Sequence, residues 1–146
     1  MNLVKELSEK PIEITVEAVV NAPVEKVWKA WTSPEDIVKW NTASDDWHTT
    51  RADNDLRVGG KFTSRMEAKD GSVGFDFWGT HNEIKPNEMI SSAMGDGRKM
   101  RVTFIPEGGS TKVVETFEAE NENTIELQEG GWQAILNNFK KYVEAN

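Results

Sequence analysis

The chain has 146 residues, enough for a substantial core, and we expect residues 1–146 to form a single domain. It contains no cysteine, which excludes disulfides, thiol catalysis and Cys-ligated metal clusters. The formal net charge is −8 and the basic residues do not cluster, so we expect no nucleic-acid partner. No apolar run approaches the ~20 residues of a membrane span, and residues 1–10 lack a signal-peptide pattern, so we expect a cytoplasmic protein without integral membrane association.

The chain begins with a predicted strand and two short helices. Residues 12–18 alternate apolar and polar side chains, which is typical of a half-buried strand. Four apolar side chains then recur at the spacing of one helical face: Val24, Val27, Trp28 and Trp31. Ser33 and Pro34 are residue types favoured at an N-cap and at the first helical position, so a second short helix should begin there.

The middle of the chain alternates with period two and is interrupted by turns rich in glycine, asparagine and aspartate. This pattern predicts six strands, at residues 47–53, 60–68, 73–84, 89–94, 99–105 and 111–119. Their short connections indicate an antiparallel meander. A long amphipathic C-terminal helix is predicted by the helical spacing of Trp132, Ile135, Leu136, Phe139, Tyr142 and Val143.

This order of elements predicts an α+β protein with a helix-grip fold. A curved seven-stranded antiparallel sheet would wrap around the long C-terminal helix, and two short helices would follow the first strand. The space between sheet and helix would be either filled by side chains or open as a cavity. Gly130 and Gly131 fall within the helix, where each costs about 1 kcal/mol relative to alanine. They indicate either a close approach of helix and sheet or a kink that makes space beneath the helix.

Several motifs support the same fold. The segment 55–62 (DLRVGGKF) has the form D-x-R-x-G-G-x-F, and residues 22–35 contain A-P-x-x-x-V-W-x-A-W-T-S-P-E. Together they resemble the START-like, or birch-pollen-allergen-like (SRPBCC), superfamily. Within it the chain is similar, over residues 12–144, to the group named for the C-terminal domain of the activator of heat-shock protein 90 ATPase, also labelled polyketide-cyclase-like. The resemblance implies the helix-grip fold, and this superfamily includes carriers of hydrophobic molecules, sensors, cyclases, hydrolases and co-chaperones.

Motifs for metals, nucleotides and nucleophilic catalysis are not found in the sequence. The two histidines, His48 and His81, lack metal-ligand spacing. Residues 53–55 begin like a calcium loop, but Arg57 and Val58 follow where an oxygen ligand and a glycine are required. We therefore expect no metal and no cofactor, and we consider an enzyme less expected than a binding protein.

Polar residues on faces that should point inward are the stronger signal. His81 shares a face of the strand 73–84 with Phe75, Phe77 and Glu83, and Glu115 lies between apolar residues of the strand 111–119. Burying such a group costs several kcal/mol unless it is paired or solvated. His81 and Glu115 therefore bond each other, line a cavity as polar anchors, or are turned to solvent by a register bulge.

The tryptophans give a second signal. Trp40 and Trp47 flank the loop 41–46, near the expected open end of the grip, and would lie at a pocket mouth or in a small hydrophobic core. We expect the loss of Trp40 to cost less stability than the loss of Trp28. Trp78 alternates with Phe77 and would face outward as a contact residue.

These features predict a protein that binds a hydrophobic or amphipathic small molecule, such as a lipid or polyketide, between sheet and C-terminal helix. The expected ligand contacts are Trp40, Trp47, Ser64, Met66, Phe75, Phe77, His81, Glu115 and Phe117. One alternative is a small cyclase- or hydrolase-type enzyme, which a tight polar network and a strongly shifted His81 pKa would favour. Another is a co-chaperone-like module with a chaperone partner, which a filled cavity and an exposed apolar strip around Trp78 would favour.

Overall fold

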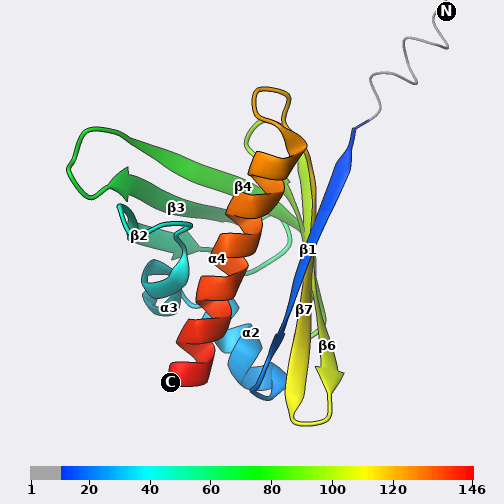
Figure 1. Cartoon of the computed structure of the whole chain (residues 1–146). Helices are drawn as coiled ribbons and strands as arrows, with labels where there is room; N and C mark the ends of the chain where they lie inside the picture. The colour runs from blue at the N-terminus through cyan, green and yellow to red at the C-terminus, as the bar shows by residue number, and fades with distance from the viewer. Residues whose placement is uncertain (1–10) are drawn as a thin grey trace, which may run out of the picture.

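The computed structural model describes residues 11–146 and confirms the α+β helix-grip architecture (Figure 1). The elements are β1 (Glu13–Val20), α2 (Val24–Thr32), α3 (Pro34–Trp40), β2 (Trp47–Asn54), β3 (Lys61–Ala68), β4 (Gly74–Lys85), β5 (Met89–Met94), β6 (Lys99–Glu107), β7 (Ser110–Glu118) and α4 (Ile125–Ala145). Every predicted strand agrees with the observed one to within two residues at each end. Within residues 11–146, no helix is long and apolar enough to cross a membrane.

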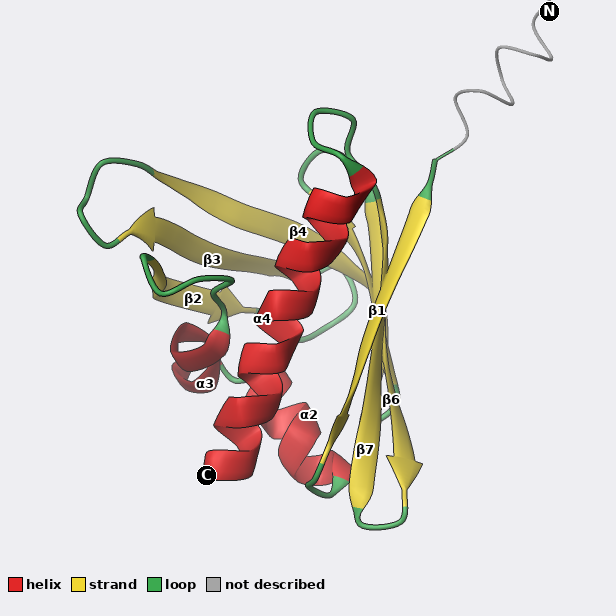
Figure 2. Ribbon diagram, viewed as in Figure 1, coloured by secondary structure: helices red, strands yellow, loops and turns green. Residues whose placement is uncertain are grey.

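The sheet is an antiparallel meander whose last strand also pairs with the first. Its order is β1-β7-β6-β5-β4-β3-β2, so β1 and β2 form the two edges. Figure 2 shows β1, β6 and β7 on one side of α4 and β2, β3 and β4 on the other, with the helix lying between the two arms of the curled sheet. The curvature gives the sheet a concave face that is available to the helix.

The inward and outward faces differ from the predicted pattern at the end of β1 and in β4. In β1 the alternation continues past the predicted end, because Val20 is fully buried whereas Val19 is 43% exposed. In β4 a register shift between His81 and Glu83 interrupts the pairing with β5. The prediction that Glu83 shares the face of His81 is therefore wrong: this bulge turns Glu83 to solvent and packs Ile84 against the core.

The main core lies at the C-terminal half of α4. Leu136, Phe139 and Val143 are almost completely buried and pack with residues of α2, α3 and the sheet. Phe139 contacts both Trp31 and Trp40 edge-on, with ring centroids 4.9 and 4.8 Å apart. Burial of each such side chain contributes about 1.5–3 kcal/mol. This cluster attaches the helix firmly at one end of the sheet.

Trp40 is part of this core. It is 5% exposed, stacks on Trp31, and its indole Nε1 donates to the Ala30 carbonyl oxygen at 2.9 Å. Trp28 is only partly buried and contacts Phe104 at 5.4 Å. The structure thus favours the reverse of the predicted order of stability losses, because the interlocked helices α2 and α3 enclose Trp40.

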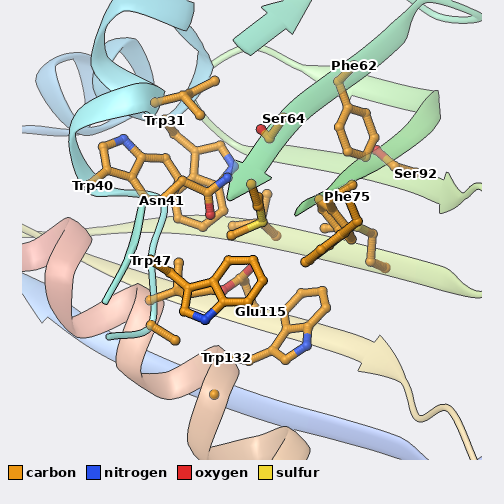
Figure 3. Close-up of a pocket in the computed structure, with 18 of the residues that line it drawn as sticks. Trp31, Trp40, Asn41, Trp47, Phe62, Ser64, Phe75, Ser92, Glu115 and Trp132 are labelled. Carbon is orange, nitrogen blue, oxygen red and sulfur yellow. The ribbon is translucent and has the colours of Figure 1, made fainter. Parts of the chain in front are cut away.

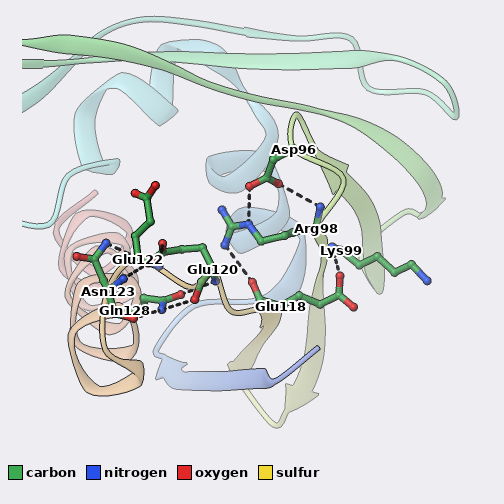
Figure 4. Close-up of polar contacts among 8 residues, drawn as sticks. All are labelled: Asp96, Arg98, Lys99, Glu118, Glu120, Glu122, Asn123 and Gln128. Atoms are coloured by element: carbon green, nitrogen blue, oxygen red, sulfur yellow. Dashed lines mark hydrogen bonds and ion pairs between the residues drawn. The ribbon is translucent and has the colours of Figure 1, made fainter. Parts of the chain in front are cut away.

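The N-terminal end of α4 is held by polar contacts rather than by a core (Figure 4). The Gln128 side chain exchanges hydrogen bonds with the backbone of Glu120, and it also donates to the Asn123 carbonyl oxygen. Arg98, paired with Asp96, donates to the Glu118 carbonyl oxygen at 3.0 Å. These contacts fix the loop that connects β7 to α4, and so determine where the helix begins.

The turn between β2 and β3 is tightly packed around Gly60. The Gly60 carbonyl oxygen accepts from the His81 backbone N–H at 2.9 Å, and the Gly59 N–H donates to the His81 carbonyl oxygen at 2.8 Å. A Cβ atom at Gly60 would collide with the carbonyl oxygen of Asp55. The close backbone approach at this motif positions His81 within the sheet.

We predict that Gly60→Ala lowers the free energy of unfolding by more than ~2 kcal/mol, because backbone atoms must shift to accept the methyl group. Gly109→Ala is the control, since nothing lies within 4 Å of a Cβ atom there. Its effect should stay within ~0.5 kcal/mol in urea unfolding. Equal midpoints for the two variants would contradict the close approach.

We predict that Trp40→Ala costs ~3–5 kcal/mol, as expected for loss of a buried aromatic side chain. Trp28→Ala should cost less, because its ring is only partly buried. Chemical denaturation of both variants measures the difference, and a larger loss at Trp28 would show that Trp40 is not a core residue.

Candidate functional site

A cavity of about 480 Å³ lies between the sheet and the N-terminal half of α4 (Figure 3). Residues from α2, α3, β2 to β7 and α4 line it, and most of their side chains are apolar. The volume is within the ~300–1,000 Å³ typical of sites for small organic ligands. The helix grip is thus filled by a core at one end and open at the other.

Eight of the nine predicted contact residues line this cavity: Trp40, Trp47, Ser64, Met66, Phe75, Phe77, His81 and Glu115. Phe117 does not. It is 1% exposed, and the ring of Trp132 stacks on it with centroids 3.8 Å apart. The alternation of β7 predicts that Phe117 lines the cavity. The ring of Trp132 covers Phe117 and lines the cavity in its place.

The entrance is surrounded by exposed apolar side chains. Phe75 is 49% exposed and Leu127 is 63% exposed, although both also line the cavity. Trp47 lies beside Phe75, with ring centroids 5.9 Å apart. Exposed apolar groups that surround a cavity are a common feature of surfaces that receive hydrophobic ligands. Of the two tryptophans expected near the mouth, Trp47 lies there and Trp40 forms a wall next to the core.

The inward face of α4 leaves room for the cavity. Gln128, Gly131, Trp132 and Ile135 are spaced along one helical face, and all four line it. Nothing lies within 4 Å of a Cβ atom built at Gly130 or Gly131. The close-approach interpretation of these glycines is therefore wrong, and the missing side chain of Gly131 leaves open space beneath the helix.

His81 is the centre of a polar network. Its Nε2 lies 2.7 Å from Oδ1 of Asn54, and its Nδ1 lies 3.1 Å from the hydroxyl of Ser92. The Asn54 amide nitrogen donates to the Thr32 carbonyl oxygen, so Oδ1 must accept. His81 therefore carries its proton on Nε2, and Ser92 donates to Nδ1. The chain of hydrogen bonds joins β5, β4 and β2 to the end of α2.

Burial favours the neutral form of His81. Burial lowers the pKa of the imidazole, against a smaller opposing effect of Asp55. The ring also stacks on Phe62 at 5.2 Å. Since both ring nitrogens are bonded to Ser92 and Asn54, the alternative of a hydrogen bond between His81 and Glu115 is wrong.

Glu115 is buried in a different way. Its side chain is on the inward face of β7, the residue is 5% exposed, and it lines the cavity. No residue among 11–146 hydrogen-bonds or ion-pairs with its carboxyl group. Desolvation raises the pKa of this carboxyl to about 8, so it is mostly protonated at neutral pH.

Several lining residues were not predicted. The helical spacing predicts Trp31 and Trp132 as core residues, and Asn54 and Ser92 have no signal in the sequence beyond their polarity. Asn54 lies between Asp53 and Asp55 in a turn-like segment, and only the pairing of β2 with β3, and of β3 with β4, brings it near His81. Within the described part of the chain, no three His, Asp or Glu side chains gather closely enough to hold a metal ion.

The sequence of residues 21–144 matches the family described as "Activator of Hsp90 ATPase homolog 1-like protein". Because the match covers most of the chain, the protein belongs to this family, in agreement with the START-like (SRPBCC) superfamily that the motifs resemble. No curated protein matches the chain.

Solved structures support this membership. The AHSA1-like protein from Aeromonas hydrophila is 50% identical, with a TM-score of 0.87 over 92% of this chain and 93% of that one. A protein from Cytophaga hutchinsonii is 52% identical, with a TM-score of 0.79 over 92% and 93% of the two chains. A protein from Chromobacterium violaceum shares the fold at 24% identity, with a TM-score of 0.82 over 93% of this chain and all of the other. The family suggests a ligand-binding or co-chaperone-like module.

We predict that the protein loses stability as pH rises through the titration of Glu115. The folded-state pKa is about 8, above the usual 4.5, so between these values the folded state retains a proton that the unfolded chain releases. Each pH unit in that window costs up to about 1.4 kcal/mol. Glu115→Gln removes this pH-dependent loss of unfolding free energy, so the variant should be more stable than the wild type at pH 8.

The measurement is urea unfolding from pH 5 to 8 of the wild type, Glu115→Gln and Glu13→Gln. Glu13 is an exposed glutamate of β1, so its variant should follow the wild type. If the unfolding free energies of the wild type and Glu115→Gln change with pH in parallel, Glu115 is ionised in the folded protein and the prediction is wrong.

Proposed function

We propose that the protein binds a hydrophobic or amphipathic small molecule in the cavity between the sheet and α4. The observation that supports this most directly is the cavity itself, about 480 Å³ in volume and lined by aromatic side chains. Each methylene group moved from water into it would contribute about 0.8 kcal/mol. The exposed side chains of Phe75 and Leu127 at the entrance would be covered by a ligand that fills the cavity and reaches its mouth.

Polar groups on the wall would orient the ligand. Ser64 is buried and its hydroxyl makes no hydrogen bond with residues 11–146, so it can serve a polar group of the ligand. Ser92 already donates to His81, but its oxygen can still accept a hydrogen bond. The ligand would thus be an apolar molecule with a small number of polar groups.

The network around His81 is the observation that favours a cavity enzyme. A buried imidazole with a lowered pKa, bonded to a serine and an asparagine, is an arrangement found in catalytic sites. However, Ser92 lies within a paired strand, between β4 and β6, and Glu115 does not orient the imidazole. We therefore rank binding above catalysis.

The family name favours a co-chaperone-like module with a chaperone partner. That alternative requires an exposed apolar surface outside the cavity, and Trp78 is the candidate at 39% exposure. The amine of Lys61 covers its ring at 4.6 Å, and Gly95 packs against it. An open cavity together with a partly covered Trp78 supports the small-molecule proposal.

We also propose a cytoplasmic location. The chain has no cysteine, so its fold does not depend on the oxidising conditions in which disulfides form.

Native mass spectrometry of the freshly purified protein, compared with its denatured mass, tests for a retained ligand. An additional mass that is lost on denaturation would identify a bound molecule. If the protein is free of ligand, titration with N-phenyl-1-naphthylamine, a neutral fluorescent probe, tests the cavity directly.

We predict that Gly131→Leu weakens binding of this probe by about tenfold or more, because leucine would occupy open space in the cavity. Gly130→Leu is the matched control: Gly130 is also in α4 but is exposed and does not line the cavity. Both substitutions should stabilise the helix by up to about 1 kcal/mol, so lost binding would not reflect unfolding. Equal binding by the two variants would place the probe elsewhere on the protein.

A further inference from the structure

The apolar cavity explains binding of a hydrophobic body but gives no role to the carboxyl group of Glu115. A buried carboxyl without a partner destabilises the fold, as its titration implies, and a neutral side chain would fill the position at lower cost. We propose that the cavity takes an organic ammonium ion on a hydrophobic body, and that the cation pairs with the Glu115 carboxylate. This inference rests on the proposed ligand-binding function and specifies the class of ligand.

The surroundings of Glu115 provide no competing partner. Its neighbours across the sheet are Val16 of β1 and Val102 of β6, both buried and apolar. Facing it from α4 are cavity-lining residues without a titratable group, among them Trp132 and Ile135. Its carboxyl oxygens have no hydrogen-bond partner among residues 11–146, and neither oxygen is completely buried. The carboxyl group is therefore open to the cavity. A ligand can therefore reach it.

The charge of the cavity favours a cation. The titratable residues that line it are Asp53, His81 and Glu115, and no lysine or arginine of residues 11–146 does so. Burial lowers the His81 pKa, so the imidazole stays neutral around pH 7. Asp53 is exposed near Arg51 at the end of β2, with 3.5 Å between their charged atoms. An anionic ligand would meet only negative or neutral groups, whereas an ammonium ion would find its counter-charge.

Aromatic faces close to Glu115 add to this preference. Trp132 stacks on Phe117, the next inward residue of β7, and Figure 3 shows Trp132 and Glu115 pointing into the same cavity. Phe77 meets Trp132 edge-on at 6.2 Å. The negative face of an indole ring attracts cations, most strongly where water is excluded. A carboxylate in the same cavity as the Trp132 ring is a suitable environment for an ammonium group.

Binding would release a proton. At pH 7 the carboxyl of free Glu115 is mostly protonated, and an alkylammonium ion is positively charged. When they pair, the carboxyl proton goes to solvent, and the bound state holds a carboxylate and an ammonium ion. Affinity should therefore rise by up to about tenfold per pH unit from pH 6 to 8. His81 remains bonded to Ser92 and Asn54 and takes no part in this exchange.

The test compares three probes of equal chain length by titration calorimetry: decylamine, decan-1-ol and decanoate. We expect the wild type to bind decylamine about tenfold more tightly than decan-1-ol, and decanoate most weakly. In buffers of different ionisation enthalpy, decylamine should release close to one proton at pH 7, and decan-1-ol none. With Glu115→Gln the advantage of decylamine over decan-1-ol should be lost, and a cooperative urea-unfolding transition at pH 7 shows that the variant is folded.

Other outcomes separate the two proposals. If decan-1-ol or decanoate binds more tightly than decylamine, or if Glu115→Gln retains the preference for decylamine, the ammonium inference is wrong and the binding cavity stands. If none of the three probes binds the wild type, and N-phenyl-1-naphthylamine does not bind either, the proposed ligand-binding function itself is wrong.

Discussion

The uneven attachment of α4 to the sheet is the constraint on which the rest of the structure depends. Its C-terminal half is fixed by Leu136, Phe139 and Val143, which are almost completely buried. Its N-terminal end is held by the polar contacts of Gln128 instead. Between these two attachments the helix spans the curled sheet, and Gly131 adds no side chain to the gap. A close-packed interior would not leave a void of about 480 Å³ without such an arrangement.

Tryptophan side chains form the boundary between core and cavity. Trp31 and Trp40 stack on each other and contact Phe139, yet both also line the cavity. Trp132 similarly covers Phe117 with one face. Large rigid rings suit this position, because one face can pack against the core while the other remains available to a ligand without losing its orientation.

The two buried ionisable groups of the cavity differ in how their polarity is compensated. His81 has a hydrogen-bond partner for each ring nitrogen, so it is held in one tautomer and adds rigidity. Glu115 has no partner among residues 11–146 and retains its proton instead. The first arrangement stabilises the site, and the second leaves a chemical group free to respond to a ligand.

The amino-acid sequence by itself determined the element order, the strand limits and the inward face of most strands, because these depend on local periodicity and turn residues. It indicated that His81 and Glu115 lie on otherwise apolar strand faces, and left open whether a register bulge turns them to solvent. The tertiary structure alone decided the rest. A bulge in β4 turned Glu83 outward, Trp132 covered Phe117, and the pairing of β2, β3 and β4 brought Asn54 to His81. Whether a buried polar group is bonded or free depends on segments distant in the sequence, and local patterns contain no information about those distances.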